Sequence, residues 1–346
     1  MWQLQNVRLP RPSLKQILYS GLGGGVSILG IMLAIALYVV DTITRPKKRN
    51  AFDLYAVSPY ELDLPAELVV FPPLYGKHKV SGWYIPHPRA TTTILVCPGF
   101  RSRKADVLGI SAHLWRAGHH VLVFEYYGHG TEVGTPVTLG FREINDFLGA
   151  LAYAKERDPQ TRLGVLGYSM GAAIAIMCAV RNDDIEVVVA DSAFATHWSA
   201  VDYNFRRAFP VPGLLSAPFL WLADHLLWWR AGYRFHQVEP LRDVGRISPR
   251  PILLIHGEKD SMIDPHDARL LYAAAGEPKE LWMVPDADHC GAYFIDRSAY
   301  STKIAAFFDS HLRKPRLQLV ESEHIPEEPV KTSNVSDSTQ DLPEAS

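Results

Sequence analysis

The chain has 346 residues, of which 47% are hydrophobic and 21% are charged, so it can bury one large core and carry an additional segment or two. Its formal net charge is -2 and its basic clusters flank an N-terminal apolar run, which argues against a nucleic-acid partner. The three cysteines, Cys97, Cys178 and Cys290, lie far apart. This spacing excludes a Cys-x-x-Cys metal or redox motif and argues against a disulfide framework.

An uncharged apolar run covers residues 17–40, with basic residues before and after it. A helix over this run would be about 36 Å long, enough to cross a hydrocarbon core of about 30 Å. A cleaved signal peptide is the competing interpretation, but no Ala-x-Ala-like site precedes Asp41. A buried soluble helix is less favoured, because five glycines in the run would cost helicity in water. We therefore expect an N-terminal flank over 1–15 and a transmembrane anchor over 16–40, whose orientation the basic residues at both ends do not decide.

After a linker over 41–64, the pattern predicts one α/β domain over 65–312, which begins within a proline-rich, irregular stretch over 51–90. Two strands are expected near 68–71 and 79–85. From residue 92 onward, short apolar runs alternate with amphipathic stretches, as is typical of a mostly parallel sheet with helices on both faces. Further strands are predicted at 93–97, 121–125, 163–166, 186–190, 251–256 and 281–285, and helices at 104–117, 141–157, 170–181, 266–275 and 299–312.

Residues 193–246 interrupt this alternation and are rich in aromatic side chains, including Trp198, Trp221, Trp228 and Trp229. An insertion between two core strands predicts a cap over one end of the sheet. Substrate recognition and simple packing of a lid are both open as its role. The last segment, 313–346, is predicted to be a disordered acidic tail.

The pentapeptide Gly167-Tyr168-Ser169-Met170-Gly171 lies between a predicted buried strand and a predicted helix. A Gly-x-Ser-x-Gly motif in this context is typical of a serine nucleophile on a sharp, strained turn. The glycines leave room for that turn, and the turn presents the hydroxyl at the carboxyl end of the sheet. An ordinary turn with a capping serine is the alternative. We therefore expect Ser169 to be the nucleophile.

A serine hydroxyl needs a base, and that base needs an acid to orient it. His289 follows the last predicted core strand and is the expected base. Asp260, in the loop after the preceding strand, is the first choice for the acid, with Asp264 and Asp191 as rivals. Asp288 is too close to His289 along the chain and is expected to be solvated.

Two backbone N–H groups are expected to form the oxyanion hole. One belongs to Met170, the residue after the nucleophile, and the other to Phe100, in the loop after the first parallel strand. This chemistry needs no metal and no organic cofactor.

The motif and the chain order Ser169, Asp260, His289 resemble the α/β-hydrolase superfamily over roughly residues 65–312. The closer resemblance is to membrane-anchored serine hydrolases and serine aminopeptidase-like proteins, in which a segment like 251–260 carries the acid. That resemblance implies a catalytic Asp260.

The chain departs from the family pattern at two places. Cys97-Pro98-Gly99 stands where the family commonly has a His-Gly pair, which leaves the shape of the oxyanion loop open. Glu125 and Tyr127 stand where the family has the first and third residues of Asp-x-Arg-Gly-x-Gly, a change that we interpret as structural. Neither departure removes a member of the expected triad.

These features predict a membrane-anchored serine hydrolase that cleaves an ester-type substrate, lipid or other apolar acyl esters included, through an acyl-enzyme. Its expected partners are a small-molecule or lipid-like acyl substrate and a membrane. One alternative is an aminopeptidase-like serine peptidase, which would need a cap carboxylate such as Asp202, Asp224 or Glu239 to hold the substrate amine. The other is a catalytically inert, membrane-tethered binding module.

Overall fold

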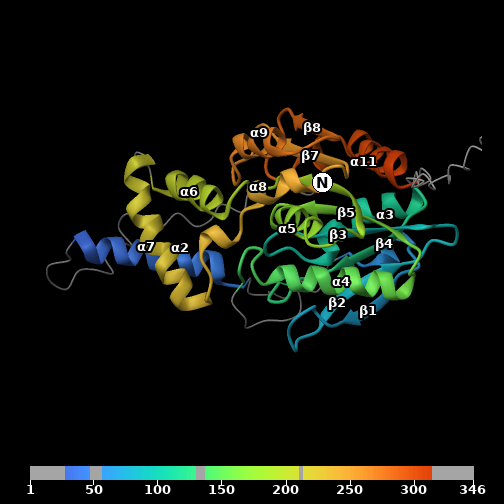
Figure 1. The fold of residues 1–346 in the computed structure, drawn as a ribbon, viewed down its shortest axis with the longest axis horizontal. Coiled ribbons are helices and arrows are strands. Elements are labelled where there is room, and N and C mark those ends of the chain that lie inside the picture. The colour runs from blue at the N-terminus through green and yellow to red at the C-terminus, as the bar shows by residue number, and fades with distance from the viewer. Residues whose placement is uncertain (1–27, 47–56, 130–136, 210–212, 314–346) are drawn as a thin grey trace, which may run out of the picture. The chain divides into compact units, whose positions relative to one another are not determined.

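The computed structural model describes residues 28–46, 57–129, 137–209 and 213–313. An eight-stranded sheet lies at its centre, in the order β1-β2-β4-β3-β5-β6-β7-β8 (Figure 1). The first two strands are antiparallel to their neighbours, and all later pairs are parallel. The strands are β1 (Glu67–Phe71), β2 (Val80–Ile85), β3 (Thr92–Cys97), β4 (His120–Phe124), β5 (Arg162–Tyr168), β6 (Ile185–Asp191), β7 (Ile252–Gly257) and β8 (Lys279–Val284).

Helices cover both faces of the sheet, which confirms the predicted fold class. Strand β3 shows why its sequence is apolar at nearly every position. Leu95 and Cys97 belong to the core on one face, whereas Ile94 and Val96 belong to the core on the other face. The helices are α2 (Ile28–Thr44), α3 (Leu108–Arg116), α4 (Glu143–Arg157), α5 (Met170–Ala179), α6 (His197–Ala208), α7 (Gly213–Ala231), α8 (Pro240–Asp243), α9 (Pro265–Ala274), α10 (Ala292–Ile295) and α11 (Arg297–Leu312).

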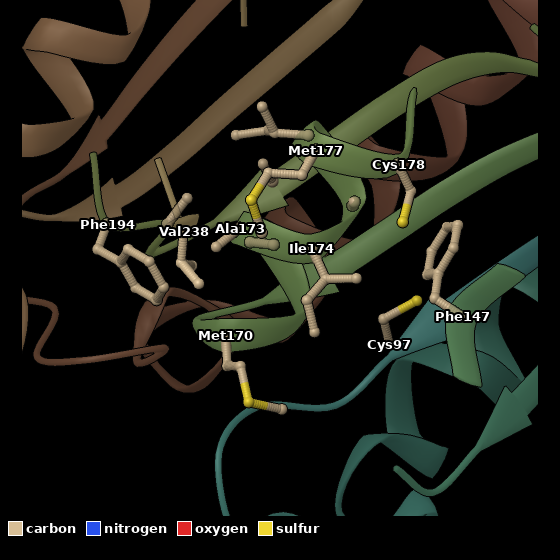
Figure 2. Close-up of a cluster of buried hydrophobic side chains, with 14 of the residues drawn as sticks. Cys97, Phe147, Met170, Ala173, Ile174, Met177, Cys178, Phe194 and Val238 are labelled. Carbon is tan, nitrogen blue, oxygen red and sulfur yellow. The ribbon is translucent and has the colours of Figure 1, made fainter. Parts of the chain in front are cut away.

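Helix α5 is buried along its whole length and forms the centre of one core (Figure 2). Its side chains Ile174 and Cys178 lie close to Cys97 of β3 and Phe147 of α4 in that cluster. Each large apolar side chain buried in such a core contributes about 1.5–3 kcal/mol. The packing therefore fixes the start of α5, where the predicted nucleophile lies.

Three helices, α6, α7 and the short α8, lie within the segment 193–246 for which the sequence predicts a cap. On α7, the buried residues Leu220, Ala223 and Leu227 recur at helical spacing, so they form one apolar face. Trp228 and Trp229 lie outside this face and are 57% and 77% exposed. The segment for which a cap is predicted thus combines a packed face with exposed aromatic rings.

Helix α2 begins within the predicted anchor and continues past Val40 to Thr44. It packs against α7, beside which it lies in Figure 1, and it buries Ala36 and Val39 in the same core. Within the described residues, no helix has the length and the apolar character needed to span a membrane. Residues 16–27 of the predicted anchor, the flank 1–15 and residues 314–346 of the predicted tail lie outside the described residues.

Candidate active site

Ser169 lies between β5 and α5 in a strained backbone conformation, with φ 52° and ψ -115°. The two glycines of the motif are needed for this turn. A Cβ atom on Gly167 would lie 2.4 Å from the Gly171 carbonyl oxygen, and one on Gly171 would lie 2.4 Å from the Cys97 carbonyl oxygen. Both neighbours are backbone atoms that cannot move away cheaply. The sequence therefore forms the sharp strand-to-helix turn that the motif predicts.

The structure brings Ser169, His289 and Asp260 together at the carboxyl ends of the parallel strands. The Ser169 Oγ atom lies 2.9 Å from His289 Nε2, and His289 Nδ1 lies 2.8 Å from Asp260 Oδ2. Ser169 follows β5, Asp260 follows β7 and His289 follows β8, so one edge of the sheet collects all three. Asp260 is fully buried, whereas Ser169 is half-buried and accessible.

The environment sets the charge on both partners of the serine. Burial acts to raise the pKa of Asp260, but hydrogen bonds from His256 and His289 outweigh it and hold that pKa below its ordinary value. Burial acts to lower the pKa of His289, but Cys290 and Asp260 outweigh it and raise that pKa well above its ordinary value. The backbone N–H groups of Met262 and Ile263 also donate to Asp260 Oδ1, each at 2.8 Å. Asp260 is thus an ionised, fixed acceptor for the His289 ring.

The rival carboxylates are engaged elsewhere. Asp264 caps α9 and accepts a hydrogen bond from the His266 backbone N–H. Asp191 is buried and accepts hydrogen bonds from the Ser192 and Tyr300 hydroxyls at 2.9 and 2.6 Å. Among the three candidates, only Asp260 has a carboxylate hydrogen-bonded to His289.

Asp288 is exposed, as expected, but its carboxylate also forms hydrogen bonds within the protein. It accepts hydrogen bonds from the backbone N–H groups of Ser261 and His289, each at 2.8 Å. These bonds tie the loop that carries the acid to the loop that carries the base.

Two contacts to Asp260 were not predicted. The His256 Nε2 atom lies 3.2 Å from Asp260 Oδ2, and the Tyr203 hydroxyl on α6 donates to the Asp260 carbonyl at 3.0 Å. His256 lies at the end of β7 and is completely buried. Its position four residues before Asp260 is the sequence feature from which this contact could have been predicted. The Tyr203 contact joins segments 57 residues apart and has no local sequence signal.

The loop after β3 lies against the nucleophile. A Cβ atom on Gly99 would lie 3.3 Å from the Ser169 Cβ, so the residue before Phe100 lies against the turn that carries Ser169. Within the described ranges, no acceptor is assigned to the backbone N–H of Phe100 or of Met170. Met170 follows the serine directly and Phe100 follows Gly99, so among the described residues both predicted donors remain candidates for the oxyanion hole.

The second departure from the family pattern has a structural explanation. Glu125 is buried and forms an ion pair with Lys104 at 3.1 Å, and the backbone N–H of Tyr127 donates to Asp146 at 2.8 Å. The Tyr127 ring stacks on the His78 ring, with ring centroids 4.1 Å apart. The described part of the chain contains no group of three or more His, Cys, Asp or Glu side chains placed to hold a metal ion.

Comparisons with known proteins show which family the chain resembles over most of its hydrolase domain. The model of the alpha/beta hydrolase family matches residues 94–300. The uncharacterized protein YqkD of Bacillus subtilis is 28% identical over 244 residues, which cover 70% of this chain and 78% of YqkD.

Solved structures show the same fold. The Pyrococcus furiosus esterase Pf2001 aligns with a TM-score of 0.64 and 22% identity, over 78% of this chain and 98% of the esterase. The Pyrococcus horikoshii acylaminoacyl peptidase aligns with a TM-score of 0.53 and 14% identity, over 73% of this chain and 42% of the peptidase. The family match covers more than half of the chain. The chain therefore belongs to the alpha/beta hydrolase family.

Proposed function

We propose that the chain is a serine hydrolase that cleaves ester-type acyl substrates through an acyl-enzyme. The observation that carries this proposal is the continuous series of hydrogen bonds from Ser169 through His289 to Asp260, located on a strained strand-to-helix turn. Family membership supports a hydrolase, and the geometry supports serine as its nucleophile.

The proposed reaction has two steps. In the first, His289 Nε2 takes the proton of the Ser169 hydroxyl while Oγ attacks the substrate carbonyl carbon, and the N–H groups of Phe100 and Met170 stabilise the oxyanion. His289 then gives its proton to the leaving alkoxide, the C–O bond breaks and the acyl group stays on Ser169. In the second step, His289 takes a proton from a water molecule while the water oxygen attacks the acyl carbon. The bond between that carbon and Ser169 Oγ then breaks, His289 returns the proton to Oγ, and the carboxylic acid is released. Asp260 holds the His289 ring and stabilises its charged form throughout.

The cap favours an ester substrate over a peptide with a free amine. Of the three carboxylates that could hold a substrate amine, Asp202, Asp224 and Glu239, the first two already have partners in the protein. Asp202 accepts a hydrogen bond from the Ser216 hydroxyl at 2.6 Å, and Asp224 pairs with Arg234 at 2.9 Å. The exposed tryptophans of α7 support an apolar acyl or lipid-like substrate, because aromatic rings combine apolar area with a polar edge.

The test combines a substrate panel with a probe that reacts with activated serines. We expect the purified full-length chain to hydrolyse p-nitrophenyl esters faster than aminoacyl amides, and a fluorophosphonate probe to modify Ser169, as located by peptide mass spectrometry. Faster cleavage of the amides would favour the peptidase. Failure of the folded chain to react with the esters, the amides and the probe would favour the inert binding module.

The raised pKa of His289 predicts a specific pH dependence. The base must be neutral to accept the serine proton, so kcat/KM should fall as the pH drops through the pKa of His289. Because that pKa is raised, the midpoint should lie above the ordinary histidine value of about 6.5. The measurement is kcat/KM for a p-nitrophenyl ester as a function of pH, with Ser169→Ala as the background. A midpoint below about 6.5 would contradict the proposed environment of His289.

The proposal includes attachment to a membrane by the N-terminal apolar run. Because Ala36, Val39 and Val40 are buried in the protein core, the lipid-crossing part would end before Ala36. Residues 16–35 as a helix would still be about 30 Å long. Release of the full-length chain from membranes by alkaline carbonate, without detergent, would contradict this attachment.

A further inference from the structure

Arg101, the residue after Phe100, connects the oxyanion loop to the N-terminal helix. Its Nη2 atom donates hydrogen bonds to the carbonyl oxygens of Thr42 and Arg45, each at 2.8 Å, and its Nε atom donates to the Arg45 carbonyl at 3.1 Å. These carbonyls lie at the C-terminal end of α2, more than fifty residues away in sequence. One side chain therefore binds two distant parts of the chain.

The chemistry of this contact suits a guanidinium group. The last carbonyls of a helix have no partner within the helix, and they form the negative end of its dipole. The fork of N–H groups on Arg101 satisfies two of these carbonyls at once. On its other side, the guanidinium carbon lies 4.6 Å from the centre of the Phe100 ring. The cation thus lies between the end of α2 and the side chain of a proposed oxyanion residue.

The end of α2 is itself firmly held. The Val137 backbone N–H donates to the Thr44 carbonyl at 3.0 Å, and Arg230 of α7 donates to the Thr44 hydroxyl at 3.2 Å. Ala36 and Val40 are buried in the core. Arg101 is therefore attached to a fixed point.

The backbone of Arg101 explains why a fixed point is needed. Arg101 has φ 60°, a left-handed conformation that is strained for a residue other than glycine. The side-chain bonds to α2 offset this strain. If these bonds are lost, we expect the backbone at Arg101 to relax and to shift the preceding residue Phe100, and with it the Phe100 N–H.

We infer that Arg101 is a positioning residue for the oxyanion hole, and that the C-terminal end of α2 is the support on which it acts. This inference rests on the proposed function, because it assigns the Phe100 N–H a place in the acyl-transfer reaction. It makes the N-terminal helix a part of the catalytic apparatus and gives it a role beyond tethering.

The experiment compares Arg101→Gln and Arg101→Lys with Arg103→Gln in the full-length chain. Arg103 is a matched control, because it is an arginine of the same loop whose side chain pairs with Asp106. We expect Arg101→Gln to lower kcat for a p-nitrophenyl ester by about 10- to 100-fold with KM within about twofold, because only the transition state uses the oxyanion donors. Arg101→Lys should recover part of the loss, because an ammonium group can bind one of the carbonyls.

A second measurement does not depend on catalysis. In hydrogen exchange followed by mass spectrometry, Arg101→Gln should speed exchange around Ser102, whose N–H donates to the Gly99 carbonyl at 3.2 Å. Arg103→Gln should leave it unchanged. If the wild type hydrolyses no ester, the proposed function fails and the role in the oxyanion hole fails with it. The exchange result then decides only whether Arg101 holds the loop in place. Equal kcat and equal exchange in Arg101→Gln and Arg103→Gln would overturn it, and Arg101→Lys serves the same comparison if Arg101→Gln does not fold.

Discussion

Ser169→Ala is expected to lower kcat for a p-nitrophenyl ester by about 10⁴- to 10⁶-fold, because it removes the atom that forms the acyl-enzyme. The substitution itself should leave the fold intact. Alanine meets the same backbone constraint as serine at φ 52°, and the Ser169 side chain has His289 as its hydrogen-bond partner. Steady-state kinetics and a thermal unfolding curve measured on the same preparation check both statements.

Ser192 provides a closely matched control. It also has a left-handed backbone, with φ 57°, and it follows the neighbouring strand β6. Its hydroxyl donates to Asp191 and accepts from the Cys290 N–H. Ser192→Ala should therefore lower the free energy of unfolding by about 1–3 kcal/mol and reduce kcat much less than Ser169→Ala does. Retention of activity in Ser169→Ala, or a larger loss of kcat in Ser192→Ala, would show that the nucleophile is another residue.

Asp260→Asn should lower kcat by about 10⁴-fold while the loop keeps its shape. The asparagine oxygen still accepts from the Met262 and Ile263 N–H groups, which hold the loop. Its amide group, however, faces His289 Nδ1 with a donor. The imidazole must then carry its proton on Nε2, where it can no longer accept the proton of Ser169.

The rival acid Asp264 supplies the comparison for this substitution. Asparagine caps a helix about as well as aspartate, so Asp264→Asn should keep α9 and change kcat by less than about threefold. For both variants, kcat, KM and the midpoint of thermal unfolding should be measured under one set of conditions. A greater loss of kcat in Asp264→Asn than in Asp260→Asn would contradict the assignment of the acid.

The sequence predicted the sheet, the order of its strands along the chain and the position of Ser169, because these depend on local patterns. Alternating apolar runs mark the strands, and the two glycines mark the turn. It favoured Asp260 as the acid but left Asp264 and Asp191 as rivals, because all three residues are at or near strand ends. Their separation required knowing which carboxylate lies 2.8 Å from His289.

Contacts between distant segments were beyond the reach of these patterns. Tyr203 on α6 and Arg101 in the oxyanion loop both bind backbone carbonyl groups, and any residue supplies a carbonyl. Such partners leave no trace in residue type or spacing. For the same reason, the apolar run up to Val40 gave no sign that its last turns pack on the hydrolase core.

The packing of α2 also decides where the chain can be shortened from its N-terminal side. Removing residues before Ile28 leaves α2 and its terminal carbonyls in place. Removing residues through Arg45 takes away both acceptors of Arg101 along with the apolar run. A protein shortened in that way would retain Ser169, His289 and Asp260, and we expect its activity to understate that of the complete chain.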